Sequence, residues 1–309
     1  MSITVARPTR RQVSFARLRP SPAFLMLAPA LLYLVAMTQA PFVLTIWYSL
    51  HNWILTSPQL GHKWIGLDNF RYEIESDPIF RSALVNSLVM TIGIVGFSLA
   101  FGLGFALLLN RTFRFRSIVR ALMIAPFFVM PTVSGIVWKN LFLNPIFGFL
   151  SWVTTSLGMS RLDLLATHAK LSVIGIASWQ WTPFMMLILL AGLQGIPDDV
   201  REAAKVDGAS ATREFFSITL PLLGSYFELA ILLGVMYVLQ LFGEIFVTTQ
   251  GGPGTETTTL PYYVYQTIAQ ANDVGTASAQ GLLGVVFASI IAAFLLRLST
   301  RALKRGDLA

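Results

Sequence analysis

The sequence has no cysteine, few histidines and little charge for its length. Without cysteine, the 309-residue chain has neither disulfides nor thiolate metal sites. Its three histidines, His51, His62 and His168, are scattered and have no metal-ligand spacing. Only 12% of the residues are charged, against roughly a quarter in a typical soluble domain, whereas 55% are hydrophobic. This composition favours a membrane protein.

Six apolar segments are long enough to cross a lipid bilayer, which takes about 20 helical residues. They cover residues 23–50, 83–109, 118–138, 171–193, 222–242 and 277–296. The first is too long for the apolar core of a signal peptide, which spans about 7–15 residues. The sequence therefore predicts an all-α, polytopic membrane protein with six transmembrane helices in a single transmembrane domain, residues 23–296.

Basic residues are distributed unevenly among the connections between these segments. Sixteen lysines and arginines lie in the N-terminal arm (1–22), the second and fourth connections and the C-terminal tail (297–309), and six lie on the other side. Because basic residues accumulate on the cytoplasmic side of a membrane, both termini are predicted to be cytoplasmic. The net charge of +7 thus reflects topology at a lipid surface and does not indicate a nucleic-acid partner.

A charged block, residues 197–221, interrupts the apolar sequence between the fourth and fifth segments. A proline followed by two aspartates at its start predicts a helix over residues 198–206. Gly208 is suited to a turn with positive φ, and Ser210 or Thr212 is suited to capping a second short helix. By this pattern alone, the charged block is an amphipathic surface loop.

The order of residues in the charged block resembles the cytoplasmic signature of ABC importer permeases: E-A-A, three residues, G, nine residues, I-x-L-P. The stretch EAAKVDGASATREFFSITLP matches this signature in register. The resemblance implies a coupling segment that contacts an ATP-binding subunit through Glu202, Ala203, Ala204, Asp207 and Gly208. The alanines permit close approach, and Glu202 has a charge to pair with a basic residue of that subunit.

The chain has no G-x-x-x-x-G-K-[ST] phosphate loop, so ATP and magnesium would be bound by separate subunits, and no cofactor or metal is expected here. The resemblance implies two ATP-binding cassette subunits, a second homologous permease that completes a heterodimer, and a periplasmic or lipid-anchored solute-binding protein. It also implies a bacterial cytoplasmic (inner) membrane. The chain itself is expected to be a non-catalytic permease that works by alternating access.

Two further stretches resemble carbohydrate importers. TTQGGPGTETTTL, after the fifth segment, is similar to one permease of the maltose and glycerol-phosphate transporter class. IAPFFVMPTVSGIVWKNLFLNP and EIFVTTQGGPGT are similar to sorbitol and mannitol permeases. The resemblance implies a polyol or related sugar as cargo, with an oligosaccharide or glycerol phosphate as the alternative. The large periplasmic insert of the maltose type is absent, so contacts with a binding protein would come from short loops.

Polar and aromatic side chains inside the apolar segments are candidates for the substrate pathway, because polar groups in a membrane usually face a cavity or the bundle interior. Sugar hydroxyls need hydrogen-bond partners, and sugar C–H surfaces fit flat aromatic rings. Spacing in the fifth segment predicts one shared helix face for Tyr237, Gln240, Leu241 and Glu244. Glu244 is also close to the outer interface, where a hydrated carboxylate is the alternative.

Resemblance to the maltose class puts sugar-contacting positions near Gln180, Trp181, Val238 and Leu241. The last two are apolar, so that site is not copied intact. Thr132, in the third segment, completes the candidate pathway. A purely structural role remains the alternative for each of these residues, since Gln and Thr also bond to neighbouring helices.

Other function classes fit the sequence less well. An ion-coupled secondary transporter needs acidic groups within its spans, and only Glu228 and Glu244 lie within or at the edge of one. A membrane enzyme is disfavoured because neither H-E-x-x-H nor G-x-S-x-G is present. Small residues Gly284, Ala288 and Ala292 share one face of the sixth segment and predict close helix packing, against either its own bundle or the second permease.

Overall fold

The structure is a computed structural model that describes residues 22–57, 59 and 61–306. The predicted basic arm therefore lies outside the described residues, apart from Pro22. The described part is mostly helical, which confirms the all-α class. Its two short strands, β1 (His51–Asn52) and β2 (Lys63–Trp64), pair antiparallel with His51 opposite Trp64.

Contacts divide the chain into two units, residues 1–45 and 46–309. Helix α1 (Pro22–Ser49) supplies the described part of the first unit and passes through Pro29 and Pro41 without ending. Its apolar side chains are exposed, including Met26 at 84% and Leu32 at 73%. An apolar helix with this exposure has its surface available for lipid or for another chain.

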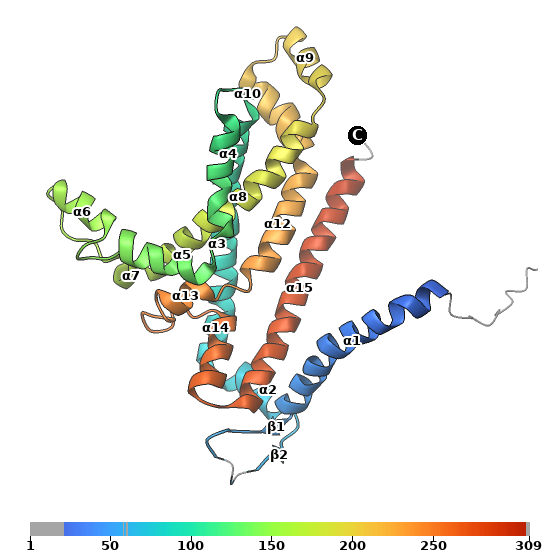
Figure 1. Cartoon of the computed structure of the whole chain (residues 1–309), viewed down its shortest axis with the longest axis vertical. Helices are drawn as coiled ribbons and strands as arrows, with labels where there is room; N and C mark the ends of the chain where they lie inside the picture. Colours follow the sequence, from blue (N-terminus) through green and yellow to red (C-terminus); the bar gives the residue numbers. More distant parts are fainter. Residues whose placement is uncertain (1–21, 58, 60, 307–309) are drawn as a thin grey trace, which may run out of the picture. The chain divides into compact units, whose positions relative to one another are not determined.

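The second unit is built around four helices: α3 (Pro78–Asn110), α8 (Ala169–Gly195), α12 (Gly224–Val238) and α15 (Val274–Gly306) (Figure 1). Helix α3 starts where Asp77 accepts a hydrogen bond from the Ile79 amide at 2.7 Å and Pro78 occupies the first turn. Helices α3 and α8 make the most extensive contact. Gly102 permits it, because an added Cβ would lie 2.9 Å from the Met186 nitrogen.

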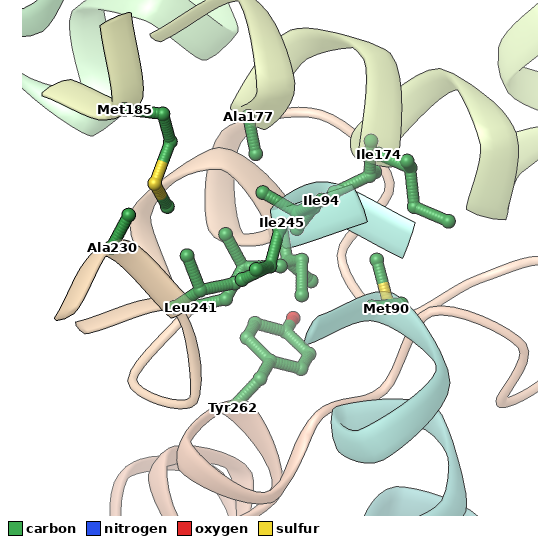
Figure 2. Close-up of a cluster of buried hydrophobic side chains, with 12 residues drawn as sticks. Met90, Ile94, Ile174, Ala177, Met185, Ala230, Leu241, Ile245 and Tyr262 are labelled. Atoms are coloured by element: carbon green, nitrogen blue, oxygen red, sulfur yellow. The ribbon is translucent and has the colours of Figure 1, made fainter. Parts of the chain in front are cut away.

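The core of this unit consists of aliphatic, methionine and aromatic side chains drawn from five helices. Figure 2 shows Met90 and Ile94 of α3 close to residues of α8, α12, α13 and α14. The labelled members from those helices are Ile174, Ala177, Met185, Ala230, Ile245 and Tyr262, and Leu241 joins them from the turn between α12 and α13. A second buried cluster joins the C-terminal half of α3 to the C-terminal half of α8 and to Leu223.

The third predicted segment is not one helix, so the prediction of a single helix over residues 118–138 is wrong. Helix α4 (Arg116–Ile124) continues as a 3₁₀ turn (Ala125–Phe128), and then the chain turns into α5 (Pro131–Val137). A π-helical turn, Trp138–Phe142, follows. The two halves meet at 101°. Pro131 explains the break, because proline lacks an amide donor and favours an extended residue before it.

The chain also bends at the start of the fifth segment. It is preceded by α10 (Ala211–Glu214), a π-helical turn (Phe215–Thr219) and α11 (Leu220–Leu222), and the run 211–222 meets α12 at 59°. By length and composition, four helices of the described chain can cross a membrane, and up to six if each bent pair is one span. The predicted number of six is the upper value.

Short elements fill the connections. Before α3 lie α2 (Asp68–Arg71) and the π-helical turn η2 (Tyr72–Ser76). The remaining ones are α6 (Phe149–Ser156), α7 (Leu164–Thr167), α9 (Asp198–Val206), α13 (Gly243–Val247), α14 (Leu260–Tyr265) and the π-helical turn Gln266–Gln270.

The predicted topology places the charged block and the C-terminal tail on the same side of the membrane, and the two lie at the same end of the second unit. Helix α9 and the C-terminal end of α15 lie at one end, and the β hairpin and α14 lie at the other (Figure 1). The predicted tail from residue 297 continues α15 as far as Gly306, and residues 307–309 lie outside the described part. Gly284 packs within its own bundle, since an added Cβ would lie 2.9 Å from Leu260 Cδ2 of α14.

Candidate functional site

The charged block has the backbone that its sequence predicts. Helix α9 spans Asp198–Val206, with two aspartates in its first turn, where the positive end of the helix dipole stabilises them. Gly208 has φ +74°, and the Ala209 amide donates to the Ala204 carbonyl at 3.0 Å, as in a Schellman helix end. Ser210, not Thr212, caps the second helix by accepting from the Arg213 amide at 3.3 Å. Two helical segments are thus joined at a glycine bend.

The two faces of α9 have different environments. Ala204 is 5% exposed and faces the chain, and Arg201 donates to the carbonyl of Leu193 at the end of α8, at 3.1 Å. Glu202, Ala203, Asp207 and Gly208 are exposed, as is Val206 at 87%. The two alanines of the E-A-A sequence therefore differ: Ala204 is buried, and Ala203 lies on the exposed surface of the helix.

A second group of predicted residues meets between α8 and α12. The rings of Trp181 and Tyr237 stack with centroids 5.6 Å apart and planes inclined by 23°. Phe184 packs edge-on to both rings, and Phe127 packs edge-on to Trp181. The sequence prediction missed Phe127 and Phe184. Phe184 had a signal, because it follows Trp181 by three residues and so lies on the same helix face.

Gln180 is buried beside the break in the third segment. Its side chain is 5% exposed, and Nε2 donates to the Val129 carbonyl at 2.6 Å. Val129 follows the 3₁₀ turn, where the chain leaves regular helix. The Gln180 Oε1 atom is buried and has no hydrogen-bond partner among the described residues. Gln180 therefore bridges α8 to the break and retains one free acceptor.

The prediction that Tyr237, Gln240, Leu241 and Glu244 share one helix face is wrong. Helix α12 ends at Val238 and α13 begins at Gly243, with turns between them. Tyr237 (54%) and Gln240 are exposed, whereas Leu241 is 5% exposed. Gln240 lines a cavity of about 480 Å³ between α12, α14 and α15, and neither Trp181 nor Tyr237 is among its lining residues.

After the break, α13 packs closely against α5. An added Cβ on Gly243 would lie 2.9 Å from Pro131 Cβ and 3.2 Å from the Thr132 backbone nitrogen, so only a glycine fits this contact. On the other side of this contact, a Cβ on Gly135 would lie 3.3 Å from the Cα of Glu244. Glu244 is consequently 2% exposed, which corrects the alternative of a hydrated carboxylate.

The remaining candidates are core residues in this conformation. Val238 and Leu241, at 1% and 5% exposed, belong to the core cluster of Figure 2, and Thr132 is half-buried. Of the four positions suggested by the maltose class, only Trp181 has a partly exposed surface. In the part of the chain that the structure describes, no three His, Cys, Asp or Glu side chains form a group that could hold a metal ion.

Comparison with known proteins identifies the family. Residues 80–305 match the family described as "Binding-protein-dependent transport system inner membrane component". The trehalose/maltose transport system permease protein MalF of Thermococcus litoralis is 34% identical over 265 residues, 85% of this chain and 88% of that protein. The sn-glycerol-3-phosphate transport system permease protein UgpA of Agrobacterium fabrum is 32% identical over 253 residues, 80% and 84% of the two chains.

A solved structure has the same fold. The bacterial alginate ABC transporter, crystallised with an alginate pentasaccharide-bound periplasmic protein, contains a chain that superimposes with a TM-score of 0.74 at 23% identity, over 90% of this chain and 94% of that one. The chain therefore belongs to the family of binding-protein-dependent transport system inner membrane components, and it is a multi-pass, non-catalytic permease subunit of an ABC importer.

Proposed function

We propose that this permease takes up a neutral sugar or polyol, with sorbitol or mannitol as the expected cargo, by ATP-driven alternating access. The observation that carries the cargo class is the stacked pair of Trp181 and Tyr237. Flat aromatic faces suit the C–H surface of a sugar or polyol, and the free acceptor of nearby Gln180 suits a hydroxyl donor. The relatives named for trehalose/maltose and glycerol phosphate and the alginate transporter support a carbohydrate-type cargo.

The charge of the helices around this pair favours a neutral cargo. From Leu171 to Gly195 in α8, and throughout α12, the sequence contains no lysine or arginine. A phosphate group is normally bound by arginine or lysine. We therefore place glycerol phosphate, the cargo named for one relative, behind a neutral polyol or sugar. An oligosaccharide fits the same side chains and remains the principal competitor.

We propose that the exposed face of α9 is the docking surface for an ATP-binding subunit. Glu202, Ala203 and Val206 lie on that face, Ala204 is buried, and Arg201 links α9 to the end of α8. The hydrogen bond from Arg201 to the end of α8 is a route by which the movement of a partner could reach α8. A second, homologous permease would complete the translocation pathway, and a loaded solute-binding protein would deliver the cargo from outside.

The test is uptake by proteoliposomes that contain the assembled transporter, its binding protein and internal ATP. Sorbitol, mannitol, maltose and glycerol 3-phosphate are supplied as radiolabelled cargo, singly and in competition. The expected result is ATP-dependent uptake of a neutral polyol or sugar. Preferential uptake of glycerol 3-phosphate would overturn the cargo class, and uptake that persists without ATP would favour the secondary-transporter alternative.

The chain offers a matched pair of variants for the aromatic site. Trp181→Ala removes the ring that stacks on Tyr237, whereas Trp179→Ala removes a ring of equal size that instead packs edge-on to Trp138. Uptake is expected to weaken in Trp181→Ala and to persist in Trp179→Ala. Equal uptake by both variants would remove the stacked pair from the pathway.

A further inference from the structure

A carboxyl group is buried at the outer end of the second unit. Glu73 lies in η2, between α2 and α3, and its side chain is 0% exposed. Gln280, near the start of α15, is also 0% exposed. Its Nε2 atom donates to Glu73 Oε1 at 3.1 Å, so this bond links residues 207 positions apart.

The same two side chains each leave one oxygen unpaired. Glu73 Oε2 and Gln280 Oε1 are both buried and have no hydrogen-bond partner among the described residues. Two unpaired acceptors in one buried pair are unfavourable, and an ionised carboxylate can only accept. A proton on Glu73 Oε2 supplies the missing donor. The protonated acid can then donate a hydrogen bond to the Gln280 oxygen or to the Asp77 side chain, while it still accepts from Gln280 Nε2.

The surroundings of Glu73 disfavour its negative charge. The pKa of Glu73 is raised from 4.5 to about 7, mainly by burial. The charges of Asp77 and Asp273 and a side-chain hydrogen bond with Asp77 contribute to this rise, and the Gln280 hydrogen bond opposes it. Tyr263, from α14, donates its hydroxyl to Asp77, not to Glu73, and Tyr72 belongs to η2 itself.

The described cations and the imidazole near this segment are engaged elsewhere. Arg71 forms an exposed ion pair with Glu75 at 3.9 Å. Arg81 donates to the backbone carbonyls of residues 74 and 75. The Nδ1 atom of His51 contacts the Trp47 carbonyl. None of these interactions supplies a positive partner for Glu73.

The pair lies where several elements are fastened together. Asp77 caps α3, and Asp273 caps α15 by accepting from the Thr276 amide at 2.9 Å. Asn69 of α2 donates to the carbonyls of Ser49 and His51, at 2.8 and 3.1 Å. The Glu73–Gln280 contact therefore ties the segment leading into α3 to the first turns of α15.

We propose that Glu73 is a neutral carboxylic acid in the assembled transporter, and that the Glu73–Gln280 pair is a proton-sensitive latch between η2 and α15. As the external pH rises, the Glu73 proton passes to a base in the outer aqueous phase, and the latch opens. The resulting carboxylate faces the oxygen of Gln280 and the charges of Asp77 and Asp273, and this repulsion separates η2 from α15. The latch would make the outer end of the transporter respond to external pH.

Infrared spectroscopy of the assembled transporter in nanodiscs tests the protonation state directly. The carbonyl stretch of protonated carboxylic acids is recorded from about pH 5 to about pH 9, and the spectrum of Glu73→Gln is subtracted from that of the wild type. The expected difference is a buried carboxylic acid band that disappears with a midpoint near pH 7. Absence of the band throughout this pH range, as expected for an ordinary glutamate with a pKa of about 4.3, would overturn the proposal.

Hydrogen exchange tests the latch itself. Glu73→Gln keeps an acceptor for Gln280 and a donor in place of the acid proton, but it has no titrating proton. Glu75→Gln alters an exposed glutamate two residues away. After correction for intrinsic exchange, residues 69–80 and 274–284 of the wild type and of Glu75→Gln should lose roughly tenfold protection between about pH 6 and about pH 8. Glu73→Gln should stay protected. Should Glu73→Gln fail to assemble, the wild type alone decides, because pH-independent protection contradicts the latch.

Discussion

Replacing Gly208 by alanine perturbs the bend of the charged block without a steric clash. Gly208 has φ +74°, and an added Cβ would meet nothing within 4 Å. The cost is therefore confined to the backbone, and it is about 1–2 kcal/mol for an L-residue in the left-handed region. That cost falls on the bent form, which the bond from the Ala209 amide to the Ala204 carbonyl closes.

If an ATP-binding subunit recognises the bent form, this energy appears as weaker docking. A cost of about 1–2 kcal/mol corresponds to roughly 5- to 30-fold weaker binding. Gly208→Asn should lose less, because asparagine tolerates the left-handed region better than alanine. Gly208→Asp adds a negative charge at the exposed surface as well, and it is expected to uncouple ATP hydrolysis while the protein remains inserted.

The assay measures the affinity of the purified ATP-binding subunit for the permease pair in detergent, together with ATP hydrolysis stimulated by the binding protein. Gly224→Ala is the matched control, because it also adds a Cβ into open space but at a glycine without positive φ. The expected order of affinity is wild type and Gly224→Ala, then Gly208→Asn, then Gly208→Ala. Wild-type affinity in Gly208→Ala, or normal stimulated hydrolysis in Gly208→Asp, would refute the reasoning.

Three further predictions concern other parts of the molecule. Trp181→Ala should raise KM for transport roughly fivefold through loss of about 1 kcal/mol of ring contact, and Trp181→Phe should recover part of it. Gly135→Ala should lower the melting temperature in detergent, because its Cβ would collide with Val247 and overpacking costs about 1–3 kcal/mol, while Gly96→Ala, which meets nothing within 4 Å, should not. Folding raises the pKa of Glu73 from 4.5 to about 7, so between these pH values the folded state keeps a proton that the unfolded chain has lost. The free energy of unfolding should therefore fall by roughly 3 kcal/mol as the pH rises from 4.5 to about 7, and then level off. Chemical denaturation at several pH values checks this, and a pH-independent result would contradict it.

The charged block was predictable because its structure follows local rules. Acidic residues at a helix start, a glycine at a helix end and a serine cap act within a few residues of one another. The predicted helix over residues 198–206 matches α9, and Gly208 has the expected positive φ. The difference in exposure between Ala203 and Ala204 was not predicted from the sequence.

The broken spans were beyond a prediction from hydropathy. Apolar composition is the same whether a segment runs straight or turns by 101°, so residues 118–138 resemble one helix. Pro131 was a visible signal for the break. The close contact of Gly135 and Gly243 with the opposite helices was not visible, and it packs α5 against α13, where Glu244 is buried.

Contacts between distant residues account for the rest. Trp181 and Tyr237 were each candidates, but their stacking depends on how α8 packs against α12. The Glu73–Gln280 pair joins residues 207 positions apart, and nothing in the local sequence around either residue indicates the other. Such pairs follow from the tertiary structure alone.

Photocrosslinking from the charged block tests the central claim most directly. The chain has no cysteine, so Val206→Cys, at a position 87% exposed on α9, provides a single thiol for a photoactivated label. Leu157→Cys, at a position 69% exposed in the connection between α6 and α7, is the control. Illumination of the assembled transporter should attach the ATP-binding subunit to position 206 and not to position 157. An adduct from neither position, or equally from both, would contradict the assignment of the charged block as the docking surface.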